Sequence, residues 1–402
     1  MSKLKCSSFI PLSGTTKDKQ NSNLINVLIF TAFFFVSLGQ LGRVSLINQQ
    51  VNFHLYEIVL FLLMICLFVR YRFKPIAWSL TKVKSFYFFA VLMVFSVFIS
   101  LFHYSSGENL IAILYLIRLI GYFIFFFYLR FYAKEIKNKK ILFNGLAIFI
   151  GITVLTSLVQ YIFYPDLRNL FYLGWDPHLY RLFGLFFDTS IGGVIYGMIF
   201  IYLLIDKPFK NKVINLTLLF TFFVFIVLTF SRSLYLALSI CIFIILMKNK
   251  SYKSFIFYLL FFIFFVMIVP KPFGEGVNLL RISSIESRSK NYFQAINIWK
   301  KNPLFGIGYN HIRYEKIKSG VDEKDLLTSH AGASFHSSFL IILVTGGIVG
   351  LIGFLWLLYQ LSKLNSFLQV LIVFLSLLSL SDNIILHPFV LFILFNFILF
   401  DK

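Results

Sequence analysis

Charged residues are scarce in this chain, and acidic residues are the scarcest of them. Only 13% of the 402 residues are charged, with 16 Asp and Glu against 37 Lys and Arg, whereas 59% are hydrophobic and the mean hydropathy is +0.85. This balance excludes an ordinary soluble globular domain and indicates a polytopic membrane protein. The net charge of +21 is mostly a bias between loops, described below, so no nucleic-acid partner is expected.

The sequence also lacks the patterns of a disulfide framework, of a metal site and of a cleavable signal peptide. Cys6, Cys66 and Cys241 fall in the N-terminal tail and in two apolar runs, so no disulfide framework and no Cys-based metal site is implied. The 7 histidines form no HxxxH or HExxH pattern, which disfavours metal-dependent chemistry, and we expect neither a metal nor another cofactor. The polar first 23 residues lack the apolar core and cleavage site of a signal peptide, so the first span is expected to be an uncleaved anchor.

Long apolar runs recur along nearly the whole chain. A helix needs about 20 apolar residues to cross the hydrocarbon core, because its backbone groups cannot be left unpaired in lipid. The pattern predicts an all-α polytopic fold with an N-terminal bundle of about nine spans over residues 1–270, a large extracytoplasmic loop over 271–335 and about three spans over 336–402. The twelve predicted spans are residues 24–42, 52–69, 86–103, 110–129, 141–163, 186–205, 213–230, 233–247, 254–270, 336–360, 366–380 and 383–400.

The placement of Lys and Arg predicts the orientation of these spans. Most of them lie in the N-terminal tail and in every second loop, whereas the short opposite loops contain only Arg43, Arg168, Arg181 and Arg232. The positive-inside rule therefore places both termini in the cytoplasm and the large loop on the outer face.

Two external loops, at residues 164–193 and 271–335, are longer than connectors need to be, and long structured loops on a rigid scaffold often carry function. In the larger loop, Arg288 precedes apolar residues at helical spacing, which predicts an amphipathic helix against the bundle or the membrane surface. These apolar residues are Tyr292, Ala295, Ile296 and Trp299. Pro303 ends that segment, and the GIG stretch after it permits a tight backbone turn.

Three arginines are expected at the outer membrane surface. Arg232 stands in the tight hairpin TFSRSLYL, Arg181 closes the shorter external loop, and Arg288 begins the amphipathic helix. A planar guanidinium binds phosphate oxygens bidentately, so the three would form a clamp for a phosphate at the height of the lipid headgroups. The alternative is that each arginine only anchors a helix end at the interface.

Arg118 and His336 occupy unusual places. Arg118 lies about 12 Å along its predicted helix from the outer end, where a charge is costly. It therefore either faces a cavity or a partner, or snorkels to the interface. His336 stands where a polar segment meets a long apolar run, and its imidazole could serve as a base near neutral pH or could simply be an interfacial or packed histidine.

Four stretches of the sequence follow one another in a fixed order. They are YRLFGLFFDTSIGG before the sixth predicted span, FSRS between the seventh and eighth, RSKNYFQAINIWKKNPLFGIGYN in the large loop and HSSFLIILVTGGIVG after it. Together they resemble the bacterial O-antigen ligase and O-antigen polymerase superfamily. SLSDNIILHPF, with Asp382 at the outer end of the eleventh span, is similar to a further family position. The family often has Pro-Asn where this chain has Asp188-Thr189, which puts the polar contact expected there in doubt.

The resemblance implies a C-type membrane glycosyltransferase fold in the bacterial inner membrane, with the active site on the periplasmic face. The donor would be a glycan on undecaprenyl pyrophosphate. The acceptor would be a sugar hydroxyl, either on another lipid-linked repeat unit (a polymerase) or on the lipid A core (a ligase). The transfer would be metal-independent and inverting, and membrane lipid and a chain-length regulator would be further partners.

The resemblance also implies roles for individual residues. His336 would deprotonate or orient the acceptor hydroxyl, and fixed cations would meet the charge of the departing pyrophosphate. These cations are Arg232 and Arg288, supported by Arg181, and the remaining substrate-binding candidates are Arg118 and Asp382.

Alternative functions remain open at this point. NPLFGIGYN favours a polymerase, whereas SLSDN favours a ligase. A flippase or transporter of lipid-linked sugar would also be polytopic and basic, but such proteins are expected to show internal repeats, and the sequence shows none. A structural scaffold would leave the placement of the arginines and of His336 unexplained.

Overall fold

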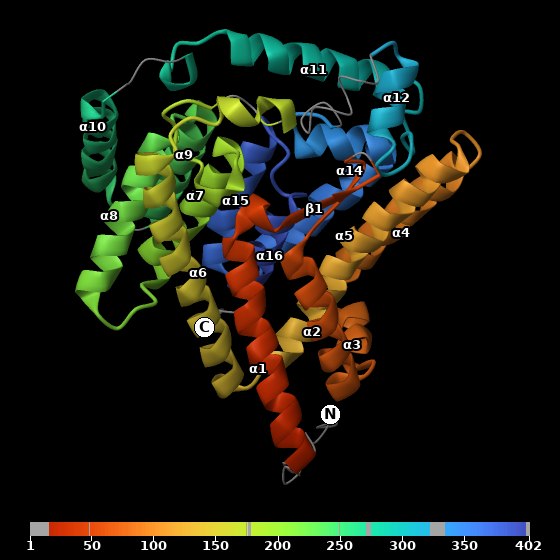
Figure 1. The fold of residues 1–402 in the computed structure, drawn as a ribbon, viewed down its shortest axis with the longest axis horizontal. Coiled ribbons are helices and arrows are strands. Elements are labelled where there is room, and N and C mark those ends of the chain that lie inside the picture. Colours follow the sequence, from red (N-terminus) through yellow and green to blue (C-terminus); the bar gives the residue numbers. More distant parts are fainter. Residues whose placement is uncertain are drawn as a thin grey trace.

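The computed structural model describes residues 16–398 except 48, 174, 176, 177, 249, 271–274 and 322–333, and most of the described chain is helical (Figure 1). Each of the twelve predicted apolar segments contains a helix, but the ends of several helices differ from the predicted bounds. These helices are α1 (Thr16–Ser37), α2 (Leu55–Tyr71), α4 (Lys84–Ser100), α5 (Ser106–Tyr132), α6 (Ile136–Phe163), α7 (Thr189–Asp206), α8 (Lys212–Leu228), α9 (Arg232–Lys248), α10 (Tyr252–Ile268), α14 (Ser338–Ser362), α15 (Ser366–Ser379) and α16 (Pro388–Ile398).

Fewer helices than twelve are long enough to cross a membrane unaided. By length and composition, four helices within the described residues qualify, namely α5, α6, α7 and α14. A fifth candidate is the pair formed by α3 (Lys74–Lys82) and α4, whose axes are bent by 97°. The helical fold is therefore confirmed, whereas the number of twelve membrane crossings stays a prediction.

Two predicted span ends form other structure beside the cavity. Residues Val51–His54 form strand β2, which pairs antiparallel with β1 (Arg43–Leu46) so that Arg43 lies opposite His54. The last predicted span begins late because residues 383–387 form turns and α16 starts at Pro388. Proline fits the first turn of a helix, and it disfavours helical geometry in the residue before it. Both corrections place polar residues beside a cavity instead of inside a span.

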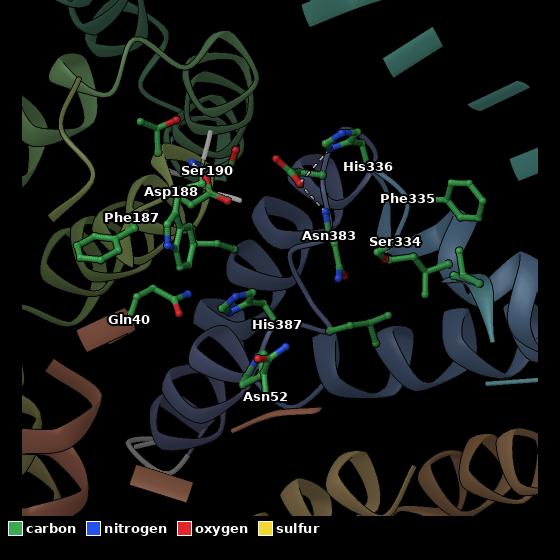
Figure 2. A pocket seen from close by; sticks show the side chains of 18 of the residues that line it. Gln40, Asn52, Phe187, Asp188, Ser190, Ser334, Phe335, His336, Asn383 and His387 are labelled. Atoms are coloured by element: carbon green, nitrogen blue, oxygen red, sulfur yellow. Dashed lines mark hydrogen bonds and ion pairs between the residues drawn. The ribbon is translucent and has the colours of Figure 1, made fainter. Parts of the chain in front are cut away.

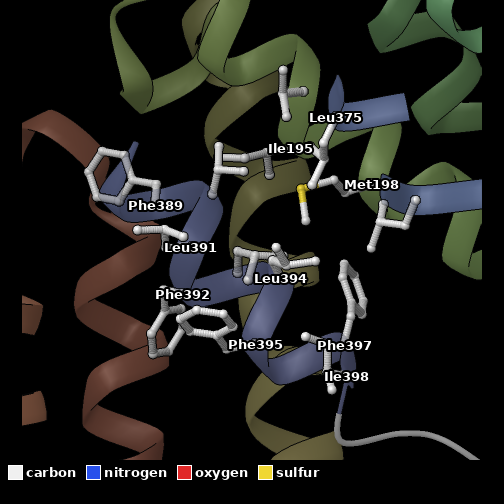
Figure 3. Close-up of a cluster of buried hydrophobic side chains, with 14 of the residues drawn as sticks. Ile195, Met198, Leu375, Phe389, Leu391, Phe392, Leu394, Phe395, Phe397 and Ile398 are labelled. Carbon is white, nitrogen blue, oxygen red and sulfur yellow. The ribbon is translucent and has the colours of Figure 1, made fainter. Parts of the chain in front are cut away.

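Helix α16 is the centre of the hydrophobic core. All its side chains from Phe389 to Ile398 are buried, and Figure 3 shows them packed beside Ile195 and Met198 of α7 and Leu375 of α15. A helix that is apolar on every side is stable only when surrounded by protein or lipid. Its 11 residues extend only about 16 Å, against about 30 Å for the hydrocarbon core. One core thus joins the helices of both ends of the chain.

Helix α14 is broken at Gly347, where φ is +66° and ψ is −168°. The break leaves backbone N–H and C=O groups of α14 without partners inside the helix. The backbone from Pro303 to Gly308, which includes the GIG stretch, forms hydrogen bonds with these groups. The hydrogen bonds run from Ile307 N to Val344 O (2.9 Å), Gly308 N to Thr345 O (3.1 Å), Ile348 N to Pro303 O (2.9 Å) and Val349 N to Leu304 O (3.3 Å). A Cβ on Gly347 would lie 2.1 Å from the Leu304 carbonyl oxygen, so the close approach requires glycine.

The predicted amphipathic helix is present as α11 (Ser283–Trp299), which lies against α14 across one end of the bundle (Figure 1). Its buried side chains are Ala295 and Ile298, and they form a small cluster with Phe335 and Val344. A shorter helix, α12 (Ile312–Lys318), follows the GIG stretch. The described part of the large loop is therefore a layer of helices over the bundle.

Candidate active site

A cavity of ≈ 790 Å³ lies between the β1–β2 hairpin, α5, the start of α7, the α8–α9 hairpin, α11, α12 and the turn before α16. Among the described residues its lining contains seven arginines and two aspartates, so the interior favours anions. The structure brings together here every site residue that the sequence singled out. They are Arg118, Arg181, Arg232, Arg288, His336 and Asp382.

His336 is positioned by three separate elements. Its backbone N–H donates to Asn291 Oδ1 on α11 (2.8 Å), and its Nδ1 lies 3.8 Å from Asp382 Oδ1 in the turn before α16. The next residue, Ser337, caps α14 by accepting from the Leu340 N–H (3.3 Å). The ring therefore projects from just before the helix, and Figure 2 shows it beside Asn383 at one end of the cavity.

Asp382 carries a negative charge next to that ring. Its burial would raise the pKa of the carboxyl, but the neighbouring His336 and Ser190 and the charge of Arg288 lower the pKa below its usual value. The side chains of His336 and Asp382 are 28% and 23% exposed, so both remain reachable from the cavity. An ionised carboxylate at this place can orient the imidazole and stabilise it when it takes up a proton.

The start of α7 carries Asp188-Thr189 where the family often has Pro-Asn. Asp188 caps α7, since its Oδ1 accepts from the Ser190 N–H (2.6 Å). Ser190 in turn is close enough to Asp382 to help lower the pKa of that carboxyl. The start of α7 therefore places polar groups next to the His336–Asp382 pair.

Arg181 and His178 form a buried pair beside this site. Arg181 is 7% exposed, donates from Nε to the Thr229 carbonyl (2.8 Å), and its Nη1 lies 3.5 Å from His178 Nδ1. Burial and the charges of Arg181 and Arg281 lower the pKa of His178 far below its usual value. Neutral His178 thus accepts from Arg181 through Nδ1, and its Nε2 has no hydrogen-bond partner among the described residues.

Arg232 ties the α8–α9 hairpin to the start of α11. Its Nη1 donates to the Leu279 carbonyl (3.2 Å) and its Nη2 to Ser284 Oγ (2.6 Å). Arg281 is anchored in the same segment by donation to the Gly276 carbonyl (2.6 Å). Arg232 therefore anchors a helix end and also faces the cavity.

Arg288 differs from Arg232, because no hydrogen bond to the described residues occupies its guanidinium. It lines the cavity, and its charge lowers the pKa of Asp382.

Arg118 lies beside the cavity and has a charged partner. Its Nε and Nη2 donate to the two oxygens of Glu57 on α2 at 2.7 and 2.8 Å, and its Nη1 donates to the Asn52 carbonyl at 3.1 Å. Tyr122 adds a hydrogen bond to the same carboxylate (2.7 Å). Arg118 therefore has both the charged partner and the cavity that the first interpretation predicted.

Several lining residues were not among the candidate site residues predicted from the sequence. They are Arg43, Arg281, Arg313, Asp188, His178 and His387. For three of them the available signal was an arginine in a segment predicted to be external, since arginine is suited to planar, bidentate anion recognition. No group of three or more His, Cys, Asp or Glu side chains within the described ranges is arranged to hold a metal ion.

Comparison with known proteins supports the resemblance. Residues 217–355 match the family model described as O-antigen ligase, a segment that contains Arg232, Arg288 and His336. No curated protein matches the chain. The resemblance to the O-antigen ligase and polymerase superfamily is thereby confirmed, and together with the apolar helices it indicates a multi-pass membrane protein of the glycosyltransferase kind.

Proposed function

We propose that this member of the O-antigen ligase and polymerase superfamily is a surface-polysaccharide polymerase. It transfers a glycan from undecaprenyl pyrophosphate to a sugar hydroxyl of another lipid-linked repeat unit, with inversion and without a metal ion. The observation that carries the proposal is the meeting of the His336–Asp382 pair with Arg181, Arg232 and Arg288 in one cavity. These residues come from segments far apart in the sequence.

The acceptor is activated by His336. With Nδ1 directed at Asp382, the other ring nitrogen, Nε2, takes the proton of the acceptor hydroxyl as the oxygen attacks the anomeric carbon. A new C–O bond forms on the face opposite the diphosphate, and the bond between the anomeric carbon and the diphosphate oxygen breaks. Asp382 stabilises the imidazolium, which later releases its proton to water.

The departing diphosphate is stabilised by arginines. As the C–O bond breaks, negative charge grows on the leaving oxygen, and preorganised donors in a partly dry cavity stabilise such charge strongly. Arg288 suits this role because no hydrogen bond to the described residues competes for its guanidinium. Arg232 and Arg181 are held in place by carbonyl groups and contribute fixed positive charge.

An apolar groove beside the cavity suits the polyprenyl tail. It has a volume of ≈ 530 Å³ and lies along α6, where Leu155 and Val159 face Leu185. Phe187 lines both this groove and the cavity, so a lipid in the groove would have its headgroup next to the start of α7. The lipid would therefore reach the arginines without crossing the protein core.

We place the cavity on the outer face of the bacterial inner membrane, with both termini in the cytoplasm. The support is the excess of Lys and Arg in the tail and alternate loops. Helix α1 begins at the side of the bundle opposite to α11, which covers the cavity (Figure 1).

A ligase that transfers the glycan to the lipid A core is the second candidate. The matched family is described as O-antigen ligase, and Asp382 lies in the SLSDN stretch that favours this function. The flippase alternative does not account for a histidine–carboxylate pair facing arginines in one cavity.

A deletion strain distinguishes the two enzymes. A polymerase mutant lacks every surface repeat beyond the first, whereas a ligase mutant accumulates finished polymer on the lipid carrier. Complementation with His336→Ala should fail at normal membrane levels, and His103→Ala is the matched control because His103 is exposed and lies outside the cavity lining. Full complementation by His336→Ala would refute the proposed chemistry.

A further inference from the structure

The cavity has a second cationic end, away from His336. Its walls are the β1–β2 hairpin, α5 and α12, and it contains Arg43, Arg118 and Arg313. Asn52, which both Arg43 and Arg118 contact, marks this end, and Figure 2 shows His387 between Asn52 and His336. Arg313 is not among the candidate site residues predicted from the sequence, and the proposed transfer step does not use it.

Arg313 is the unusual member of this group. Its Nη1 atom is buried and has no hydrogen-bond partner among the described residues. Burial lowers the pKa of Arg313, and the nearby phenol groups of Tyr314 and Tyr115 only partly oppose this. A buried guanidinium nitrogen without an acceptor is costly, so its retention beside a cavity points to an acceptor that arrives with a ligand.

The cavity as a whole is rich in positive charge, with seven arginines and two aspartates among its described lining residues. Both oxygens of Glu57 are engaged by Arg118. Arg43 donates to Asn52 Oδ1 at 3.2 Å, and its guanidinium lies 5.4 Å from the centre of the Trp175 ring. An anionic group bound at Arg313 would therefore form a charge-assisted hydrogen bond in an electropositive cavity.

The walls are also suited to a sugar. Tyr314 donates its hydroxyl to Gln50 Oε1 (3.1 Å), and Tyr115 donates to the Gln50 carbonyl (3.1 Å). These contacts fix α12 and α5 to the hairpin and keep aromatic rings, hydroxyls and amides around Arg313. Such a mixture of aromatic faces and fixed polar groups is typical of small-molecule sites.

We infer that the Arg313 end is a glycan subsite that binds an anionic substituent, a sugar carboxylate or phosphate, on a unit removed from the reacting anomeric carbon. The inference rests on the proposed function, and it adds that the repeat unit handled by this enzyme is acidic. Arg313 acts as a specificity residue and does not touch the reacting atoms.

The first experiment analyses the polysaccharide that disappears when the gene is deleted. Carbodiimide reduction followed by sugar analysis detects carboxylates, and hydrofluoric acid release detects phosphate. A carboxylate or a phosphate found in every repeat would support the subsite, whereas a polymer made only of neutral sugars would overturn it. If deletion removes no polysaccharide, the proposed function itself fails, which separates the two failures.

The second experiment does not depend on transfer. Thermal unfolding of the purified protein is followed in detergent with glucuronate, glucose or inorganic phosphate at matched ionic strength. We expect glucuronate or phosphate to stabilise the wild type more than glucose does. Arg313→Gln should raise the ligand concentration needed for half-maximal stabilisation by at least about tenfold, because a charged hydrogen bond is lost. Arg313→Lys should recover part of the effect.

Arg168→Gln is the matched control, because Arg168 is an exposed external arginine that pairs with Asp166 and lies outside the cavity lining. It should respond as the wild type does. Equal responses to glucuronate, phosphate and glucose in the wild type, or an unchanged response in Arg313→Gln, would overturn the inference.

Discussion

Replacement of Glu57 by glutamine removes the charge that faces Arg118 and keeps the shape of the side chain. The two hydrogen bonds between them measure 2.7 and 2.8 Å, and the side chains are 21% and 14% exposed for Arg118 and Glu57. Breaking a buried pair by removing one partner typically costs about 3–5 kcal/mol. Since the cavity admits some water, we expect a loss of about 2–4 kcal/mol in the free energy of unfolding for Glu57→Gln.

The chain offers a matched control in Glu135→Gln. Glu135 also pairs with an arginine, Arg70, but at 3.3 Å and with side-chain exposures of 57% and 31%. Exposed pairs contribute at most about 1 kcal/mol. Equilibrium unfolding of the purified variants in detergent, followed by tryptophan fluorescence, measures both differences.

The double variant Glu57→Gln, Arg118→Met sharpens this test. It removes both charges, and a neutral pair is often no less stable than a buried ion pair, so the double variant should be more stable than Glu57→Gln alone. Equal losses for Glu57→Gln and Glu135→Gln would refute the reasoning, as would a double variant less stable than either single one.

Three further predictions follow from the same geometry. Gly347→Ala should destabilise the protein by more than about 1 kcal/mol, because its Cβ would meet the Leu304 carbonyl at 2.1 Å, whereas Gly151→Ala has open space and should be neutral. Burial lowers the pKa of His311 to about 4 from 6.5, so the unfolded chain binds a proton in that window that the folded chain does not. Stability should therefore fall by up to about 3 kcal/mol as the pH drops from neutral to 4, and His311→Gln should flatten the pH titration of unfolding. Asp382→Asn should lower the initial rate of glycan transfer by about 100-fold or more, since the imidazolium loses its counter-charge, and an unchanged rate would contradict that role.

Sequence reasoning identified the separate chemical parts of the cavity but not their partners. Arg118 was marked because a charge in an apolar helix is costly, yet its partner Glu57 lies 61 positions away on another helix, and no local pattern connects the two. Likewise, His336 and Asp382 were found in separate motifs, and only the packing of the turn before α16 brings them within 3.8 Å.

Helix boundaries were hardest to predict where polar and apolar residues mix. Hydropathy extended the second span into residues 52–54, which pair with β1 as a strand, and the last span into the turn before Pro388. In both places tertiary contacts around the cavity override the apolar pattern. The glycines of the GIG stretch were predicted to permit a turn, but their contact with the break at Gly347 depends on backbone groups that are distant in the sequence.

The most direct test of the mechanism is the rate of transfer between purified undecaprenyl-diphosphate-linked repeat units, measured with and without EDTA. The cavity geometry predicts that EDTA leaves the wild-type rate unchanged. It also predicts that Arg288→Ala and His336→Ala each lose about 100-fold or more at normal protein levels. Inhibition by EDTA that added divalent ion reverses, or near-normal rates in both variants, would contradict it.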